Sequence, residues 1–135
     1  MDRSADFLAD SDDFLGAAGD LLQHGRWSKA CFCAQQAAEL AVKAALNRLG
    51  VERRGHDVFS LITELQQHVP AVSTLLDKAK ILDQYYIPTR YGDVFGGGSA
   101  MSHYTQLQAE QAMAFAREIY EEMKRIVQAG PQETQ

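Results

Sequence analysis

The sequence predicts an all-α fold, an antiparallel up-and-down bundle of four long helices and one shorter helix. Apolar residues recur every three or four positions along most of the chain, and no segment alternates apolar and polar residues with a period of two. Proline and glycine fall at the joints between these periodic segments. The 135 residues suit a single domain, with a core at about residues 4–128 and a disordered tail expected at residues 129–135.

A first helix is predicted by apolar residues that repeat every seven positions near the N-terminus. These residues and their apolar neighbours are Phe7, Leu8, Phe14, Leu15, Ala18, Leu21 and Leu22. Several aspartates fall on the opposite side, so the helix is amphipathic. We expect it to end near Gly25, because glycine readily adopts the left-handed backbone that often terminates a helix.

A second helix is predicted over residues 27–49, where alanine recurs on the apolar positions. Small side chains allow neighbouring helices to approach closely, which indicates the central helix of the bundle. Its polar residues form a narrow stripe, and within it Glu39 can pair with Lys43 one turn later.

The two cysteines of the chain, Cys31 and Cys33, both fall in this helix. Residues two apart on a helix point in nearly opposite directions, which disfavours a disulfide or a shared metal ion. We therefore interpret them as small buried residues rather than as a redox or metal pair.

Three further helices follow from capping signals and from the prolines. Asp57 is a suitable N-cap for a third helix that stops near Pro70, and Pro70 suits the start of a fourth. The fourth helix is expected to end before Pro88, which disfavours helical geometry at the preceding residue. Thr105, followed three residues later by a glutamine, predicts a capping box at the start of the last helix.

The overall charge excludes one class of function. With 18 acidic and 13 basic residues, the chain carries a formal charge of -5, whereas proteins with a broad DNA-binding face are usually strongly basic. No apolar run approaches the roughly 20 residues that span a bilayer, and the acidic N-terminus lacks the features of a signal peptide. We expect a cytoplasmic protein without a membrane partner.

Four stretches in this order resemble the HEPN domain family: "AQQAAELAVKAALNRLG", "GHDVFSLITEL", "LDQYYIPTRYGD" and "YTQLQAEQAMAFAREI". The similarity runs from about residue 4 to residue 128. The resemblance implies an antiparallel helical bundle that commonly forms a homodimer. It also implies nucleotide binding and a partner that is a minimal nucleotidyltransferase. In some branches of this family the pair acts as toxin and antitoxin, with the HEPN protein a metal-independent ribonuclease.

The ribonuclease branches carry an arginine and a histidine separated by four to six residues, and this spacing is absent here. After Arg90 the histidine would stand at positions 95–97, which are occupied by phenylalanine and two glycines. His56 is wrongly spaced from Arg53 and Arg54. This departure disfavours catalysis.

The stretch "LDQYYIPTRYGD" contributes most of the candidate binding residues, for a nucleotide or a short single-stranded RNA. Arg90 can present its guanidinium to a phosphate, Tyr85 and Tyr91 offer ring faces to a base, and Thr89 and Asp93 offer hydrogen bonds. The structural alternative is that Arg90 pairs with Asp93 or with helix carbonyls and that Tyr85 is half-buried. Tyr86 we interpret as a core residue.

A second candidate lies at "RRGHD", where Arg53, Arg54 and His56 stand at a helix entrance that favours anions. The alternative is a solvated turn in which Asp57 caps the helix and His56 bonds to a neighbouring loop. If the two stretches meet, these residues and Arg90 form one positive cleft. The histidines lack the spacing of a zinc helix, and the sequence predicts neither a metal nor another cofactor.

The sequence therefore predicts a homodimeric HEPN-type module that binds a nucleotide or RNA beside a minimal nucleotidyltransferase. One alternative is a metal-independent ribonuclease toxin using Arg90 with Tyr91, Tyr104 or His56. A third possibility is a scaffold protein that binds no ligand.

Overall fold

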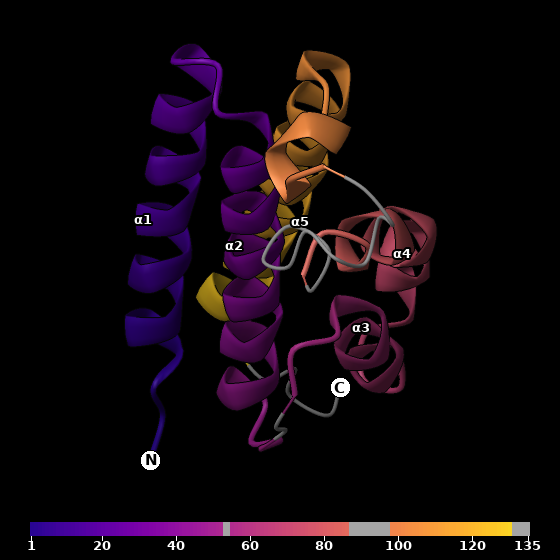
Figure 1. Cartoon of the computed structure of the whole chain (residues 1–135). Coiled ribbons are helices and arrows are strands. Elements are labelled where there is room, and N and C mark those ends of the chain that lie inside the picture. The colour runs from indigo at the N-terminus through magenta and orange to yellow at the C-terminus, as the bar shows by residue number, and fades with distance from the viewer. Residues whose placement is uncertain (53–54, 87–97, 131–135) are drawn as a thin grey trace.

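The computed structural model of the chain describes residues 1–52, 55–86 and 98–130. Within these ranges it contains five α-helices and two 3-10 helices, and no strand. The elements are α1 (Ser4–Gln23), α2 (Trp27–Arg48), α3 (Val58–Gln66), η1 (Pro70–Leu75), α4 (Leu76–Asp83), η3 (Ala100–His103) and α5 (Gln106–Ala129). The predicted all-α bundle is confirmed. Figure 1 shows α2 at its centre, with α1 on one side, α3 and α4 on the other, and α5 behind.

The hairpin of α1 and α2 depends on a tight turn at Gly25. This glycine has a φ of 77°, its amide bonds to the Leu22 carbonyl at 3.2 Å, and the Arg26 amide bonds to the Leu21 carbonyl at 2.9 Å. These two hydrogen bonds form a Schellman motif, which satisfies the last carbonyls of the helix. The predicted end of the first helix is confirmed.

The buried residues of α1 are Ser4, Ser11, Leu15 and Ala18, and none of them is a phenylalanine. Ser11 is buried and its hydroxyl donates a hydrogen bond of 2.6 Å to the Ala37 carbonyl. The repeating Phe14 and Leu21 are only half-buried and pack against the edge of the core. The alanines of α2 leave room for the α1 backbone but not for large rings.

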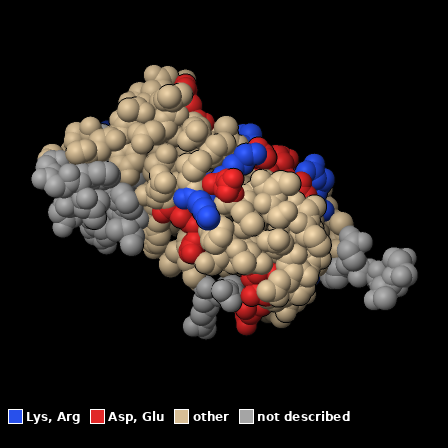
Figure 2. All heavy atoms as spheres, turned by 90° about the vertical axis from the view of Figure 1, so that its right-hand side faces the viewer, with Lys and Arg blue, Asp and Glu red and all other residues tan. Residues whose placement is uncertain are grey.

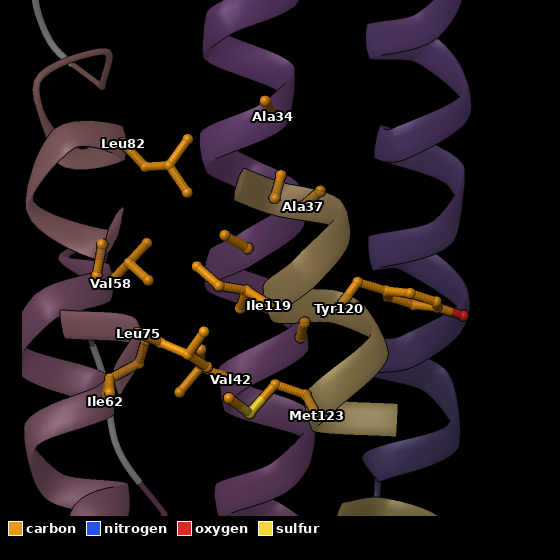
Figure 3. Packing of buried hydrophobic residues seen from close by; sticks show 14 of the residues in the cluster. Ala34, Ala37, Val42, Val58, Ile62, Leu75, Leu82, Ile119, Tyr120 and Met123 are labelled. Atoms are coloured by element: carbon orange, nitrogen blue, oxygen red, sulfur yellow. The ribbon is translucent and has the colours of Figure 1, made fainter. Parts of the chain in front are cut away.

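The core lies where α2 meets α5 on one side and α3, η1 and α4 on the other. Figure 3 shows side chains of α3, η1 and α4 pointing toward those of α2 and α5. The fully buried residues of the core include Ala34, Ala37, Val42, Val58, Ile62, Leu82, Ile119 and Met123. Every one of them is apolar, so this part of the fold is held by hydrophobic burial and close packing.

The segment that begins at Pro70 forms two helices instead of one continuous α-helix. Residues 70–75 form the 3-10 helix η1, and α4 continues from Leu76 for eight residues. Pro70 occupies the first turn of η1, as expected. After Ala71 come valine, serine and threonine, which have lower α-helix propensity than alanine, and this is consistent with the tighter geometry.

The predicted caps of α3 and α5 are confirmed. The Asp57 carboxylate accepts a hydrogen bond from the Phe59 amide at 3.1 Å. The Thr105 hydroxyl accepts a hydrogen bond from the Gln108 amide at 3.1 Å, and the Gln108 side chain accepts one from the Thr105 amide at 2.9 Å. Both bonds of the capping box are therefore present.

Both cysteines are free thiols; Cys31 is buried and Cys33 is half-buried. Burial raises the pKa of Cys31 to about 12, which suppresses its thiolate at neutral pH. This agrees with a packing role for that residue. In the described part of the chain, no helix combines the length and the apolar character needed to cross a bilayer.

Candidate functional site

Two of the eight predicted site residues, Tyr85 and His56, fall within the described ranges. The other six are Arg53, Arg54, Thr89, Arg90, Tyr91 and Asp93, which lie outside the described residues. The candidate site is therefore built from His56, from the last described residues after α4, and from the side chains that surround them.

Tyr85 and Tyr86 have exchanged the positions predicted for them. Tyr85 is buried, with 4% of its surface exposed, and its ring meets the buried Tyr104 edge-on at 5.8 Å. Tyr86 is only half-buried. The chain tightens after α4, since the Tyr85 amide bonds to the Leu82 carbonyl three residues earlier. In such a turn the third residue, rather than the fourth, lies above Leu82 and enters the core.

His56 lies beside Tyr86, so the two stretches singled out in the sequence meet in the fold. The rings are 5.1 Å apart and nearly perpendicular. Tyr86 also contacts Phe32 of α2, at 6.2 Å between ring centroids. The end of the described chain after α4 is thereby placed next to the connection between α2 and α3.

Glu39 of α2 orients the His56 ring. Its carboxylate oxygen Oε2 accepts a hydrogen bond from His56 Nδ1 at 3.0 Å and one from Lys43 Nζ at 2.9 Å. The Lys43 contact is the predicted pair one turn along α2. The histidine bonds to this helix, not to a neighbouring loop as the structural alternative supposed.

The Glu39 carboxylate is buried, with only 3% of the residue exposed. Burying a carboxylate is costly unless it is paired and hydrogen-bonded. Lys43 and His56 supply the pairing, and the Gln36 side chain donates a further hydrogen bond at 3.3 Å to Oε1. The helical repeat predicted the pair of Glu39 and Lys43. It could not predict His56 as a further partner, because this residue lies outside the helix.

Gln35 holds the backbone of the same histidine. It is fully buried, and its Nε2 donates a hydrogen bond of 2.7 Å to the His56 carbonyl. Its Oε1 accepts one from Gln36 at 2.7 Å. His56 is therefore fixed at both its main chain and its ring by α2, while 60% of its side chain is exposed to solvent.

Two carboxyl groups share the first turn of α3, directly after His56. Asp83, at the end of α4, accepts hydrogen bonds from the amides of Val58 at 2.8 Å and Phe59 at 2.9 Å. Asp57 bonds to the same Phe59 amide and to the Ser60 hydroxyl. Burial, assisted by the hydrogen bond to Asp57, raises the pKa of Asp83 to about 7. The hydrogen bond from Asp83 lowers the pKa of Asp57.

A hollow of about 460 Å³ opens beside the His56 ring. It lies between the start of α1, the second half of α2 and the connection to α3. Its walls are formed by Arg3, Phe7, Lys43, Leu46, Asn47, Val51, Glu52, Gly55 and His56. The contribution of α1 was not predicted, because Arg3 is distant in sequence and carries no motif.

A larger hollow of about 790 Å³ lies elsewhere, and no predicted site residue lines it. It is formed by Leu49, directly after α2, by the end of α5 and by the turn into η1, with mainly apolar walls. Its one arginine, Arg125, is paired with Glu122. The smaller hollow is the better candidate, since it combines convergent polar groups with an apolar wall.

The arrangement suits binding of an anion more than it suits metal chemistry. No cluster of three metal-ligating side chains occurs among the residues that the structure describes. Lys43 and Arg3 provide positive charge at the hollow, and Glu52 is the acidic residue in its wall among those that the structure describes. With Nδ1 held by Glu39, the imidazole presents its other nitrogen for contact with a ligand.

Charges on another face of the protein are mixed. Figure 2 shows lysines and arginines beside aspartates and glutamates on the side of α3 and α4. One such pair is Lys78 of α4 with Glu118 of α5, at 2.6 Å. The face drawn there carries no broad basic surface outside the residues left grey.

Comparison with known proteins decides the family. The model of the HEPN domain family matches residues 4–126. The chain belongs to the HEPN family. This confirms the resemblance found in the four sequence stretches, and the match includes both α2 and the connection that carries His56.

Three solved structures are similar to this chain, and two of them are described as HEPN proteins. TT1696 from Thermus thermophilus is 39% identical, with a TM-score of 0.89 over 93% of this chain and 99% of that one. The archaeal HEPN homologue ST0689 is 32% identical, with a TM-score of 0.78 over 94% and 99% of the two chains. A HEPN domain protein of Thermotoga maritima is 30% identical, with a TM-score of 0.74 over 90% and 97%. Comparison with curated proteins gives no match.

Proposed function

We propose that this HEPN domain is a nucleotide- or RNA-binding module that acts as a homodimer beside a minimal nucleotidyltransferase. The observation that carries the proposal is the contact of His56 with Tyr86 at 5.1 Å. It brings the connection before α3 next to the point where the chain leaves α4. Arg90 and Tyr91 follow Tyr86 by only a few residues.

The local chemistry supports ligand binding at this place. The His56 ring is largely exposed although its main chain and Nδ1 are both held by α2. An exposed ring that is fixed in orientation can contact a ligand without losing much conformational freedom. Tyr86 adds an aromatic surface of the kind on which bases stack.

Ligand-dependent thermal protection tests the proposal. The purified protein is titrated with common nucleotides and with a short single-stranded RNA, in the presence of a chelator. We expect saturable protection in the wild type, and its loss in Arg90→Ala and in His56→Ala. His68→Ala is the matched control, because His68 lines the larger hollow instead.

Three outcomes separate the alternatives. Protection by no nucleotide and no RNA contradicts the proposal and favours a scaffold. Cleavage of the RNA in chelator, absent in Arg90→Ala, identifies a ribonuclease. Sedimentation at micromolar concentration tests the dimer, for which we expect twice the 15.0 kDa of one chain; a species of 15.0 kDa alone contradicts it.

A further inference from the structure

The hollow beside His56 gathers nitrogen-bearing side chains from three separate parts of the chain. Arg3 comes from the residues before α1, Lys43 from α2, and His56 from the connection between α2 and α3. Lys43 Nζ and His56 Nδ1 contact the same carboxylate oxygen of Glu39, so they lie within about 6 Å of each other. Arg3 and Lys43 can donate hydrogen bonds to different oxygens of one phosphate, and the exposed imidazole of His56 adds a polar contact from a third direction.

The wall between these groups is apolar, through Phe7, Leu46 and Val51. The Arg3 guanidinium carbon lies 5.1 Å from the centre of the Phe7 ring, which supports the guanidinium at the edge of the hollow. A volume of about 460 Å³ falls within the range of small-ligand sites. The hollow can therefore accept a phosphate together with an attached organic group.

The charged residues at the hollow have distinct roles. Arg3 and Lys43 are positive, and Glu52 is a negative residue of the wall. The buried Glu39 carboxylate lies behind Lys43 and His56 and holds both side chains through hydrogen bonds.

We propose that this hollow binds the phosphate monoester of a nucleotide between Arg3, Lys43 and His56. The proposal rests on the proposed nucleotide binding and assigns the phosphate to a particular part of the protein. Glu39 acts as a positioning residue, since its carboxylate accepts hydrogen bonds from both Lys43 and His56.

The test compares AMP with adenosine and with inorganic phosphate, by calorimetry on the full chain. We expect AMP to bind at least tenfold more tightly than adenosine. Lys43→Gln and Arg3→Gln should each weaken AMP binding at least tenfold. Lys124→Gln in α5 makes the same change of charge away from the hollow and should leave the affinity unchanged. Arg3 is exposed and forms no ion pair among the described residues, so Arg3→Gln keeps the test valid if Lys43→Gln unfolds.

The results distinguish failure of this inference from failure of the proposed function. Equal affinity for AMP and adenosine overturns it, as does AMP binding that survives Arg3→Gln and Lys43→Gln. If AMP or RNA still binds in those variants and Arg90→Ala abolishes the binding, the proposed function stands and this phosphate site falls. If the wild type binds no nucleotide and no RNA, both are wrong.

Discussion

Two faces of the same helix, α2, are buried in different ways. One face carries alanines, among them Ala34, Ala38 and Ala41, and packs against neighbouring helices mainly through apolar side chains. The other carries Gln35 and Glu39, whose polar groups are equally buried. The first face stabilises the bundle through close packing, while the second requires a hydrogen-bond partner for each buried group.

The difference indicates that the two faces of α2 have different roles, one in the fold and one in the candidate site. Replacing a buried ion pair with apolar residues of similar size is often neutral or stabilising, so Glu39 is not explained by stability. It does hold Lys43 and His56 in position at the edge of a hollow. We interpret the alanine face as structural and the polar face as the support of a binding site.

The apolar face should be the more sensitive to truncation. Ile119→Ala in α5 leaves a cavity among fully buried residues, and we expect a loss of about 3 kcal/mol in the free energy of unfolding. Urea denaturation measures it. Leu107→Ala, at a residue that is 76% exposed, is the control and should change the value by about 0.5 kcal/mol or less. Equal losses in the two variants contradict a core centred on α2 and α5.

On the polar face, the free energy of unfolding that is lost when Glu39 is neutralised should depend on whether Lys43 is present. We expect Glu39→Gln to cost about 2 kcal/mol, because it leaves Lys43 without its carboxylate. In a Lys43→Met background the same substitution should cost clearly less. A double-mutant cycle by urea denaturation gives the coupling between the two residues. An additive cycle would show that the pair contributes nothing to stability.

Asp83, which is paired with Asp57 at the start of α3, should make the free energy of unfolding decrease as pH rises. The pKa of Asp83 is about 7 in the folded protein, well above the ordinary value of 3.8, so between these values the unfolded chain has lost a proton that the folded one keeps. The free energy of unfolding then decreases from about pH 4 to pH 7 and is constant above. Screening at this partly buried group limits the loss to about 1–2 kcal/mol.

Asp83→Asn removes this pH dependence, since an amide imitates the protonated acid and does not titrate. We expect the variant to lose less stability than the wild type between pH 5 and pH 8, by the same 1–2 kcal/mol or so. Denaturation at the two pH values provides the comparison. An equal loss of stability in the wild type and in Asp83→Asn would show that another group causes the pH dependence.

The smallest effect is expected at the polar contact inside the alanine face. Ser11→Ala removes the hydrogen bond to the Ala37 carbonyl, and alanine fits the same space, so we expect a loss of about 1 kcal/mol. Ser73→Ala, at an exposed residue of η1, should change the free energy of unfolding much less. A larger loss than at Glu39 would reverse our ranking of the two faces.

Local signals in the sequence were sufficient to predict most of the fold. Asp57 and Thr105 act as caps through side chains that reach only two or three residues ahead, and Gly25 ends α1 through its own backbone conformation. The pair of Glu39 and Lys43 is set by the helical repeat. Each of these features depends on neighbours within about one helical turn, which the sequence shows directly.

The candidate site depends on contacts between distant residues and was only partly predictable. The sequence indicated His56 as a candidate, but its hydrogen-bond partner Glu39 is 17 residues away. Arg3, near the N-terminus, lines the same hollow and is still more distant in sequence. Helical periodicity tells which face of a helix is apolar, not which neighbour covers it. The exchange of Tyr85 and Tyr86 arose because the turn after α4 is tighter than the α-helical repeat assumed.

The bond from Gln35 to the His56 carbonyl means that the connecting segment does not need a fixed length to keep this histidine in place. Its anchor belongs to a rigid helix, so residues could be gained or lost between Glu52 and Gly55 during divergence while the imidazole stayed where it is. Such tolerance would let related proteins vary the rim of the hollow, and with it their choice of ligand, around a stationary histidine. Inserting two glycines there and finding the histidine ring resonances unchanged by NMR would demonstrate it.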